Sequence, residues 1–266
     1  MQKETFIKQY AAGLNPQQLA AVQAVHGPVL LLAVPGSGKT TVLVTRLGYM
    51  VLCCDVPPAQ ILTMTYTVAA THEMRGRFAA RFGAELAGQM TFRTINGLSA
   101  VILQYYSRVY GRRQPELLTN EGDITRMLTD IWQQVNREFP TESTLKELRT
   151  AITYIKNMAL ADEEIEGLET DLANLPELYR RYQAALKRAG QMDYDDQMVF
   201  ALQILRAAPP VLAYFQQRYK YFCVDESQDT SKIQHEIIRL LAGRSLNLFM
   251  VGDEDQSIYG FRAAYP

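Results

Sequence analysis

The sequence is poor in cysteine and tryptophan, and it has no long apolar run. Three cysteines and one tryptophan occur among 266 residues. Cys53 and Cys54 are adjacent, and Cys223 stands alone in an apolar run, which fits neither zinc-ligand spacing nor a disulfide framework. This cysteine usage suits a reducing compartment. The longest apolar runs, such as residues 29–34, are far too short to span a bilayer.

The chain also lacks an excess of charge and a leader-like start. Its 27 basic and 28 acidic side chains leave a net charge of −1. No global field therefore attracts a polyanion, and a nucleic acid would have to bind through a local patch. The first ten residues are polar and lack the apolar core of a signal peptide. We therefore expect a cytoplasmic protein that does not use a membrane.

Apolar runs rich in β-branched residues recur along the chain, and each ends in a polar cluster. Continuous apolar runs of this kind predict strands that are buried on both faces of a parallel sheet. Helical patterns over 40–52 and 232–241 alternate with them, which indicates an α/β fold. Ligands of such sheets bind at the carboxyl ends of the strands, where every polar cluster falls. The five runs are 28–34, 61–67, 90–95, 221–226 and 246–253.

The middle of the chain has a different pattern. From about residue 110 to residue 190 we find no strand signal, and apolar residues recur at helical spacing in three sets. We expect an all-helical insert at 110–190 within one α/β domain made of 1–109 and 191–266. The three sets are Ile124, Leu128, Ile131 and Val135; Leu145, Leu148, Ile152 and Ile155; and Tyr179, Tyr182, Leu186 and Ala189.

The strongest local signal is "AVPGSGKTTV" at 33–42, which follows an expected strand and opens an expected helix. Gly36 and Gly38 would turn backbone N–H groups toward phosphate oxygens, and the helix N-terminus adds partial positive charge. Lys39 would reach the β- and γ-phosphates, and the Thr40 hydroxyl would bind Mg²⁺. A glycine-rich turn that only caps a helix is the alternative. The expected nucleotide-binding residues are Ala33, Val34, Pro35, Gly36, Ser37, Gly38, Lys39, Thr40 and Thr41, with Ala33 standing where the strict pattern asks for glycine.

A second chemical signal is "YFCVDESQDT" at 221–230, an apolar strand that ends in two carboxylates. Asp225 at the strand tip would hold Mg²⁺ directly or through water. Glu226, one residue on, would orient and deprotonate an attacking water. Such a pair would usually be plain surface charge, but beside a phosphate loop it predicts a site of nucleoside triphosphate hydrolysis.

Seven motifs in order resemble the superfamily 1 DNA helicases of the UvrD/Rep/PcrA type. Two of them, the phosphate loop and "VDESQDT" (224–230), were described above. The resemblance covers essentially the whole chain and implies a RecA-like P-loop NTPase core domain that carries a helical subdomain. The other motifs are "LNPQQLAAV" (14–22), "TMTYTVAATHEMRGR" (63–77), "TFRTI" (91–95), "MDYDDQM" (192–198) and "VGDEDQSIYGFRAA" (251–264).

The resemblance also assigns roles to residues. It implies ATP and Mg²⁺ as cofactors, Gln18 at the adenine edge, and Gln256 as a sensor of the γ-phosphate that acts with Lys39 and Glu226. Stacking of bases on aromatic rings stabilises a bound strand by roughly 1–3 kcal/mol per base and ignores sequence. Packing in the core is the alternative for the two aromatics of the last motif. The residues implied to bind DNA are Tyr66, Arg93, Tyr259, Phe261 and Arg262.

The implied function is that of the N-terminal part of an ATP-dependent 3′→5′ DNA helicase. Its partners would be single-stranded DNA and duplex junctions, in repair, replication or recombination. Nothing matches the motifs of the family's second core domain, so we expect the front part of a helicase that hydrolyses ATP poorly by itself. Two alternatives remain open: the helicase subunit of an AddA/RecB-type helicase–nuclease, and a nucleotide-switched DNA-binding module that does not unwind DNA.

Some positions depart from the family's pattern. Val68 and Ala69 stand where Asn-Lys is usual, which removes a cation that would contact phosphate. Arg75, Arg77 and Arg81 are candidates to replace it, and Arg77 and Arg81 share a helix face. A solvated basic face without a role in binding is the alternative. Thr41 stands where relatives often carry an arginine that stacks on adenine, so the affinity for nucleotide or the selectivity for its base is expected to differ. The last motif has Phe261 where tryptophan is usual, and its smaller face implies weaker stacking.

Overall fold

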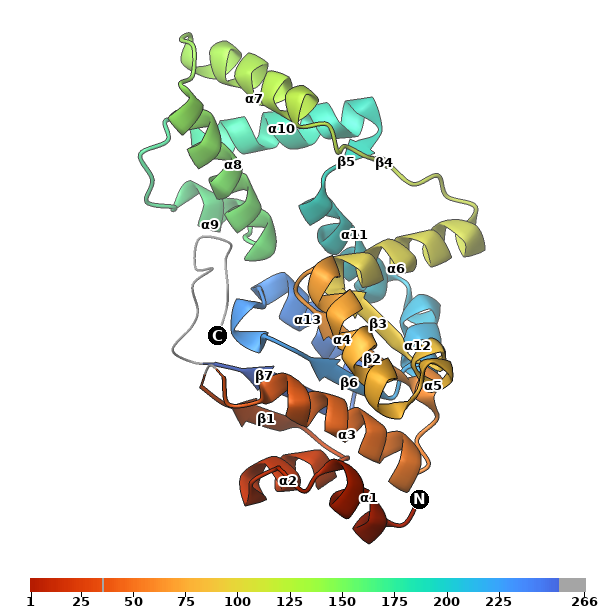
Figure 1. Cartoon of the computed structure of the whole chain (residues 1–266). Helices are drawn as coiled ribbons and strands as arrows, with labels where there is room; N and C mark the ends of the chain where they lie inside the picture. The colour runs from red at the N-terminus through yellow and green to blue at the C-terminus, as the bar shows by residue number, and fades with distance from the viewer. Residues whose placement is uncertain (35, 254–266) are drawn as a thin grey trace.

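The centre of the molecule is a five-stranded sheet in which every strand runs parallel to its neighbours. The structure is a computed structural model and describes residues 1–34 and 36–253 (Figure 1). The expected α/β fold with a parallel sheet is confirmed, and all five predicted strands form. Their spatial order is β1 (Val29–Leu32), β7 (Leu248–Gly252), β6 (Tyr221–Val224), β2 (Ile61–Thr65) and β3 (Thr91–Thr94).

Helices cover the two faces of this sheet, and each face has its own apolar core. The side chains of a strand point alternately to the two faces, so one apolar run supplies both cores. The first face carries α1 (Lys3–Tyr10), α2 (Pro16–Gln23), α3 (Lys39–Cys53), α4 (Val68–Phe82) and α5 (Ala84–Gln89). The second carries α6 (Ile95–Tyr110), α11 (Tyr194–Ala207), α12 (Pro209–Arg218) and α13 (Lys232–Ala242).

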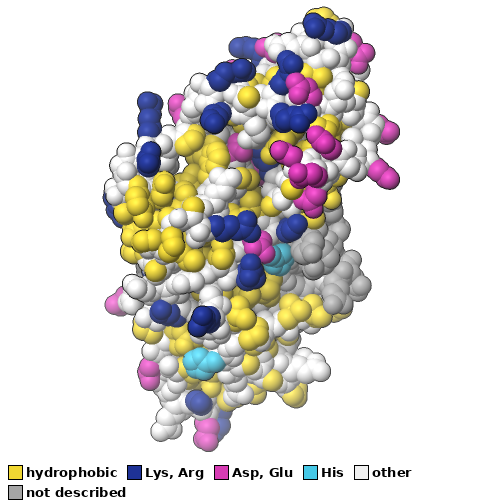
Figure 2. Space-filling model, turned by 180° about the vertical axis from the view of Figure 1, so that it is seen from behind, with side chains coloured by type: hydrophobic (Ala, Val, Ile, Leu, Met, Phe, Trp, Pro, Cys, Tyr) yellow, Lys and Arg dark blue, Asp and Glu magenta, His cyan; other side chains and the backbone are white. Residues whose placement is uncertain are grey.

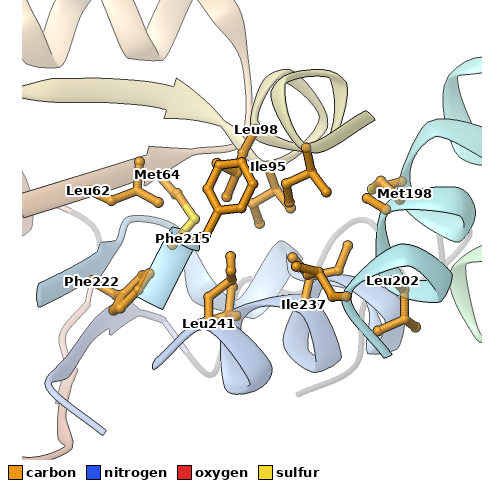
Figure 3. Close-up of a cluster of buried hydrophobic side chains, with 14 of the residues drawn as sticks. Leu62, Met64, Ile95, Leu98, Met198, Leu202, Phe215, Phe222, Ile237 and Leu241 are labelled. Atoms are coloured by element: carbon orange, nitrogen blue, oxygen red, sulfur yellow. The ribbon is translucent and has the colours of Figure 1, made fainter. Parts of the chain in front are cut away.

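The core on the second face shows how the layers meet. Figure 3 shows Met64 and Phe222 of the sheet beside Phe215, Ile237 and Leu241 from helices α12 and α13. All five side chains are buried. Burying one side chain of this size stabilises the fold by roughly 1.5–3 kcal/mol. These contacts hold β2 and β6 in register, and the carboxyl ends of both strands lie at the same edge of the sheet.

Strand β1 differs from the prediction. The run at 28–34 was expected to be buried on both faces, yet only one face of β1 is covered. Val29 and Leu31 pack against the core of the first face, whereas Leu30 is 59% and Leu32 48% exposed. Within the described residues β1 is an edge strand. The helices of the second face pack on the other strands and leave the outer side of β1 in contact with solvent.

The middle of the chain forms a helical layer with a third core. It consists of α7 (Glu121–Asn136), α8 (Glu142–Asn157), α9 (Asp162–Glu166) and α10 (Leu175–Ala189), and its buried residues run from Leu118 to Leu186. The prediction that residues 110–190 contain no strand is wrong at one point. β4 (Glu116–Leu117) pairs in parallel with β5 (Gln191–Met192) where the chain enters and leaves this layer. A strand of two residues is too short to produce a sequence pattern.

A network of buried charges joins this helical layer to the sheet domain. The ammonium of Lys156 on α8 lies 2.5 Å from a carboxylate oxygen of Asp193 and 2.8 Å from one of Asp196. Asp193 is the N-cap of α11 and Asp196 lies in its first turn, and the two cap the helix reciprocally. Thr153 and Asn157, also on α8, donate hydrogen bonds to Asp195. Three side chains of α8 therefore hold the start of α11.

We find no single helix in residues 1–34 and 36–253 that is both long and apolar enough to cross a membrane. Helices α11 and α12 reach that length and apolar content only together, and they meet at an angle of 102°. Both pack into the core of the second face.

Candidate nucleotide site and adjoining cleft

The phosphate loop connects β1 to α3 at the carboxyl edge of the sheet. Gly36 and Gly38 have φ angles of +75° and +86°, a region that side chains with a Cβ rarely adopt. Gly38 is the N-cap of α3, and Lys39 and Thr40 form its first turn. The unpaired N–H groups of that turn attract anions. Pro35 lies outside the described residues.

Gln18 lies beside this loop at the start of α2. Its side chain and that of Asn15 cap the helix reciprocally, because each accepts a hydrogen bond from the other's backbone N–H. The Nε2 atom of Gln18 donates to the carbonyl of Ser37 at 2.9 Å. The resemblance assigns Gln18 to the adenine edge, whereas here both polar atoms of its amide bind protein groups.

Lys39 faces two acids across the site. Its Nζ atom is 3.5 Å from Oε2 of Glu226 and 3.8 Å from Oδ2 of Asp253. Both distances exceed the 3.2 Å limit of an ordinary N–H···O hydrogen bond, so these are ion pairs without hydrogen bonds. The side chain is only 10% exposed. The lysine is therefore desolvated, yet a phosphate oxygen would make a better partner than either acid.

Two buried carboxylates follow β6. Burial, and then the charge of Glu226, raises the pKa of Asp225 to about 6, and the same causes raise the pKa of Asp229 to about 6. The Oδ1 atom of each accepts no hydrogen bond from the described part of the chain. An unsatisfied buried carboxylate oxygen is costly, and a cation would compensate it. Sequence reasoning found Asp225 but gave Asp229 no role.

The ends of β6 and β7 are locked together through Gln228. Its Nε2 atom donates to Oε2 of Glu226 at 2.8 Å, and its Oε1 atom accepts the N–H of Asp253 at 3.0 Å. A Cβ added to Gly252 would lie 2.4 Å from Oγ of Ser227, so this close approach requires glycine. Gln228 therefore orients the expected catalytic base, a role that sequence reasoning missed although the motif "VDESQDT" contains it.

A cleft of 740 Å³ adjoins the acids and extends to the helical layer. Its walls come from the ends of β2 and β6, the starts of α4, α6 and α11, and the face of α8. Tyr66 lines it, as does Tyr194, which is 55% exposed. Asn96 donates a hydrogen bond to the carbonyl of Tyr194 across the cleft. Tyr194 was overlooked, although an aromatic inside an acidic helix start was a usable signal.

The described lining of the cleft contains no lysine or arginine, while Asp225, Glu226, Asp229, Asp195 and Glu121 all contribute carboxylates. The charged side chains of the described lining are thus all acidic. The cleft suits uncharged bases or a metal-bound phosphate better than a bare sugar–phosphate backbone.

The other predicted DNA-binding residues lie apart from the cleft lining. Arg93 is exposed on β3 and directly precedes Thr94, which lines the cleft. Arg77 pairs with Glu73, and Arg81 donates a hydrogen bond to the carbonyl of Tyr10 on α1. That contact ties Arg81 to α1 in this structure. Four further residues to which the resemblance assigns roles lie outside the described residues: Gln256, Tyr259, Phe261 and Arg262.

No group of three or more His, Cys, Asp or Glu side chains that could by itself enclose a metal ion occurs in the described residues. Mg²⁺ does not need one, since it is usually held by one or two carboxylates together with phosphate oxygens and water. The unpaired Oδ1 atoms of Asp225 and Asp229 are donors of the kind that Mg²⁺ prefers.

A parallel sheet whose first strand enters a glycine-rich loop, with carboxylates at the end of another strand, defines a P-loop NTPase domain with a RecA-like fold. The chain belongs to the UvrD/REP helicase N-terminal domain family, whose model matches residues 14–266. An ATP-dependent DNA helicase PcrA of Leuconostoc citreum is 35% identical over 95% of this chain and 34% of its own length. PcrA helicases of Staphylococcus epidermidis and Staphylococcus aureus are 33% identical over 94% of this chain. The chain thus spans about a third of the length of these relatives.

Proposed function

We propose that this chain is the ATP-binding part of a DNA motor that uses ATP hydrolysis to move 3′→5′ along single-stranded DNA and to open duplex junctions. One observation carries the proposal: a desolvated Lys39, at the start of α3, faces Glu226 and Asp253 at distances too long for hydrogen bonds. Such a lysine is poised for an anionic ligand. The names of the relatives, ATP-dependent DNA helicases, support ATP as that ligand and DNA as the substrate.

Each residue of the site has a chemical task in this proposal. Lys39 binds the β- and γ-phosphates and the N–H groups of the loop bind their oxygens. Glu226 accepts the proton of the attacking water, and Gln228 holds Glu226 in place by the hydrogen bond to Oε2. Asp225 and Thr40 would hold Mg²⁺, which supplies charge neutralisation at the phosphates when it is bound.

Single-stranded DNA would place bases in the 740 Å³ cleft. The exposed ring of Tyr194 and the neighbouring Tyr66 offer stacking surfaces, and the acidic lining excludes the phosphates. Figure 2 shows Lys and Arg side chains spread over the rear face and interrupted by acidic ones, so this face offers no continuous basic track. Contact with DNA would then depend on bases rather than on general charge.

We also propose two structural units, a core of 1–109 and 191–266 and an insert of 110–190. The separate apolar core of α7–α10 supports this division. The β4–β5 pair supports it as well, because it lies where the chain enters and leaves the insert. Cysteines that form no disulfide within the described residues suit a reducing compartment, which supports a cytoplasmic location.

The test is equilibrium binding of Mg²⁺–ATP by calorimetry to the 266-residue chain. Lys39→Ala should abolish measurable binding, because the loop loses its mobile cation. Glu226→Gln should keep binding, since Gln still accepts the hydrogen bond from Gln228 but cannot act as a base; in a full-length protein it should remove hydrolysis. Lys8→Ala, at an exposed position on α1, is the matched control. Normal ATP affinity of the Lys39→Ala chain would overturn the assignment.

A further inference from the structure

Arg46 is the largest fully buried side chain of the described residues, with 1% of its surface exposed. It lies on α3, about two turns after Lys39. No carboxylate of the described residues comes within ion-pairing distance of its guanidinium. The neighbouring thiol of Cys223 does not neutralise it, because burial raises the pKa of that thiol to about 11.

An arginine without a counter-ion is expensive to bury, so its contacts must compensate the cost. The guanidinium lies 4.3 Å above the ring of Phe249 on β7. Nη1 donates to the carbonyl of Ala21 at 2.7 Å, and Nη2 lies 3.3 Å from the carbonyl of Val25. Ala21 belongs to the last turn of α2, whose carbonyls have no partner within the helix and carry partial negative charge. Arg46 therefore anchors the C-terminal end of α2.

The opposite end of α2 touches the phosphate loop. Gln18 donates to the carbonyl of Ser37, and α3, which carries Arg46, begins two residues later. Helix α2 is thus fixed to α3 at one end by Arg46 and to the loop at the other end by Gln18.

We propose that Arg46 is a positioning residue that shapes the phosphate loop through α2 and Gln18. A loop of this kind binds phosphate only while its N–H groups point inward, which requires its carbonyls to point away. The hydrogen bond from Gln18 holds the Ser37 carbonyl outward. Arg46 fixes the helix that presents Gln18, and so lowers the cost of ordering the loop when a phosphate binds.

The proposal rests on the proposed nucleotide site, and its test separates the two. Calorimetry would compare ATP with inorganic tripolyphosphate, both with Mg²⁺, because tripolyphosphate has no base. Arg46→Met should lower the affinity for both ligands by the same factor, about 3- to 10-fold if the effect equals the loss of one hydrogen bond. Gln18→Ala should do the same, and the double variant should be no weaker than the weaker single variant. Arg46→Lys, with one ammonium for two carbonyls, should lie between wild type and Arg46→Met.

The control is Val211→Ala, a substitution of a buried residue of α12 in the core of the second face. The loss of thermal stability is measured for this variant and for Arg46→Met, so that the two can be compared. Val211→Ala should leave both affinities unchanged. If Arg46→Met does not fold, Arg46→Lys and Gln18→Ala carry the test. Equal binding by wild type, Arg46→Lys and Gln18→Ala would overturn the inference, as would a loss confined to ATP, which would mean that α2 recognises the base instead. Failure of the wild-type chain to bind either ligand would overturn the nucleotide site itself.

Discussion

Two lysines of this chain are almost fully buried and face acids, yet they are held in opposite ways. Lys156 makes two short contacts, 2.5 Å and 2.8 Å, with carboxylates that are 14% and 3% exposed. Lys39 makes two long contacts, 3.5 Å and 3.8 Å, and one of its acids, Glu226, is 43% exposed. The first lysine joins two layers of the molecule, and the second lies at the proposed nucleotide site.

The difference shows how geometry separates a structural cation from one that awaits a ligand. A buried ammonium in short contact with two carboxylates has its charge compensated within the protein. At Lys39 the two acids supply charge at distances too long for hydrogen bonds, so an incoming phosphate oxygen could accept hydrogen bonds that these acids do not.

The largest effect should come from Lys156→Met. Removing the ammonium leaves Asp193 and Asp196 buried without their cation, which costs about 3–5 kcal/mol of the free energy of unfolding. Urea unfolding of the 266-residue chain measures the loss, and Lys146→Met at an exposed position of α8 is the control. The loss should be smaller at pH 5 than at pH 7, because an acid that has lost its cation can take up a proton instead. Equal stability of the two variants would contradict the structural role.

Tyr194 lies between the acids that Lys156 holds, and its exposed ring lines the cleft. Tyr194→Ala should weaken binding of oligo-dT by about 1–3 kcal/mol, whereas Tyr194→Phe should bind like wild type because it keeps the stacking face. Fluorescence anisotropy measures both, and Tyr110→Ala, an exposed aromatic at the far end of α6, is the control. A loss that is the same for Tyr194→Ala and Tyr110→Ala would mean that the cleft is not where bases bind.

Lys39→Met should barely change stability, in contrast to Lys156→Met. Its contacts are not hydrogen bonds and Glu226 is screened by solvent, so we expect a loss of about 1 kcal/mol or less. The same urea titration compares the two variants under identical conditions. If Lys39→Met costs as much as Lys156→Met, the distinction between a structural lysine and a ligand-binding lysine fails.

Much of the fold could be predicted because burial leaves a pattern. The strands of the sheet are continuous apolar runs, and the helices of the insert repeat apolar residues at helical spacing. β1 was predicted too simply, since an apolar run does not reveal whether the strand lies at an edge. Leu30 and Leu32 are exposed because none of the described helices covers that side.

The candidate site could be predicted only where one short segment carries the chemistry. The phosphate loop and the Asp225–Glu226 pair are such segments. The partners of Lys156 and Arg46 lie on other elements, as does Asp253, which Gln228 contacts in addition to Glu226 of its own motif. These contacts depend on packing that a motif does not encode. Lys156 left one clue, because it follows Ile152 and Ile155 on an apolar helix face.

The smallest effects should appear in the titration of Asp225, whose pKa of about 6 is raised first by burial and then by the charge of Glu226, and lowered by Lys39. The two changes should therefore shift this pKa in opposite directions: Glu226→Gln lowers it and Lys39→Met raises it. A carboxyl with a raised pKa in the folded state stabilises the fold fully below its unfolded pKa of about 4, and this contribution is lost as the pH rises through about 6. The pH range over which this contribution is lost ends at the folded pKa of Asp225. Glu226→Gln should lower that upper limit, and Lys39→Met should raise it.

Carbon-13 NMR titration of the aspartate carboxyl measures the pKa of Asp225 directly, with Glu85→Gln, an exposed acid on α5, as the control. If the pKa of Asp225 shifts in the same direction in both variants, it responds to a change of structure and not to the two charges. The assignment of Lys39 and Glu226 as opposite charges that act on one site would then fail.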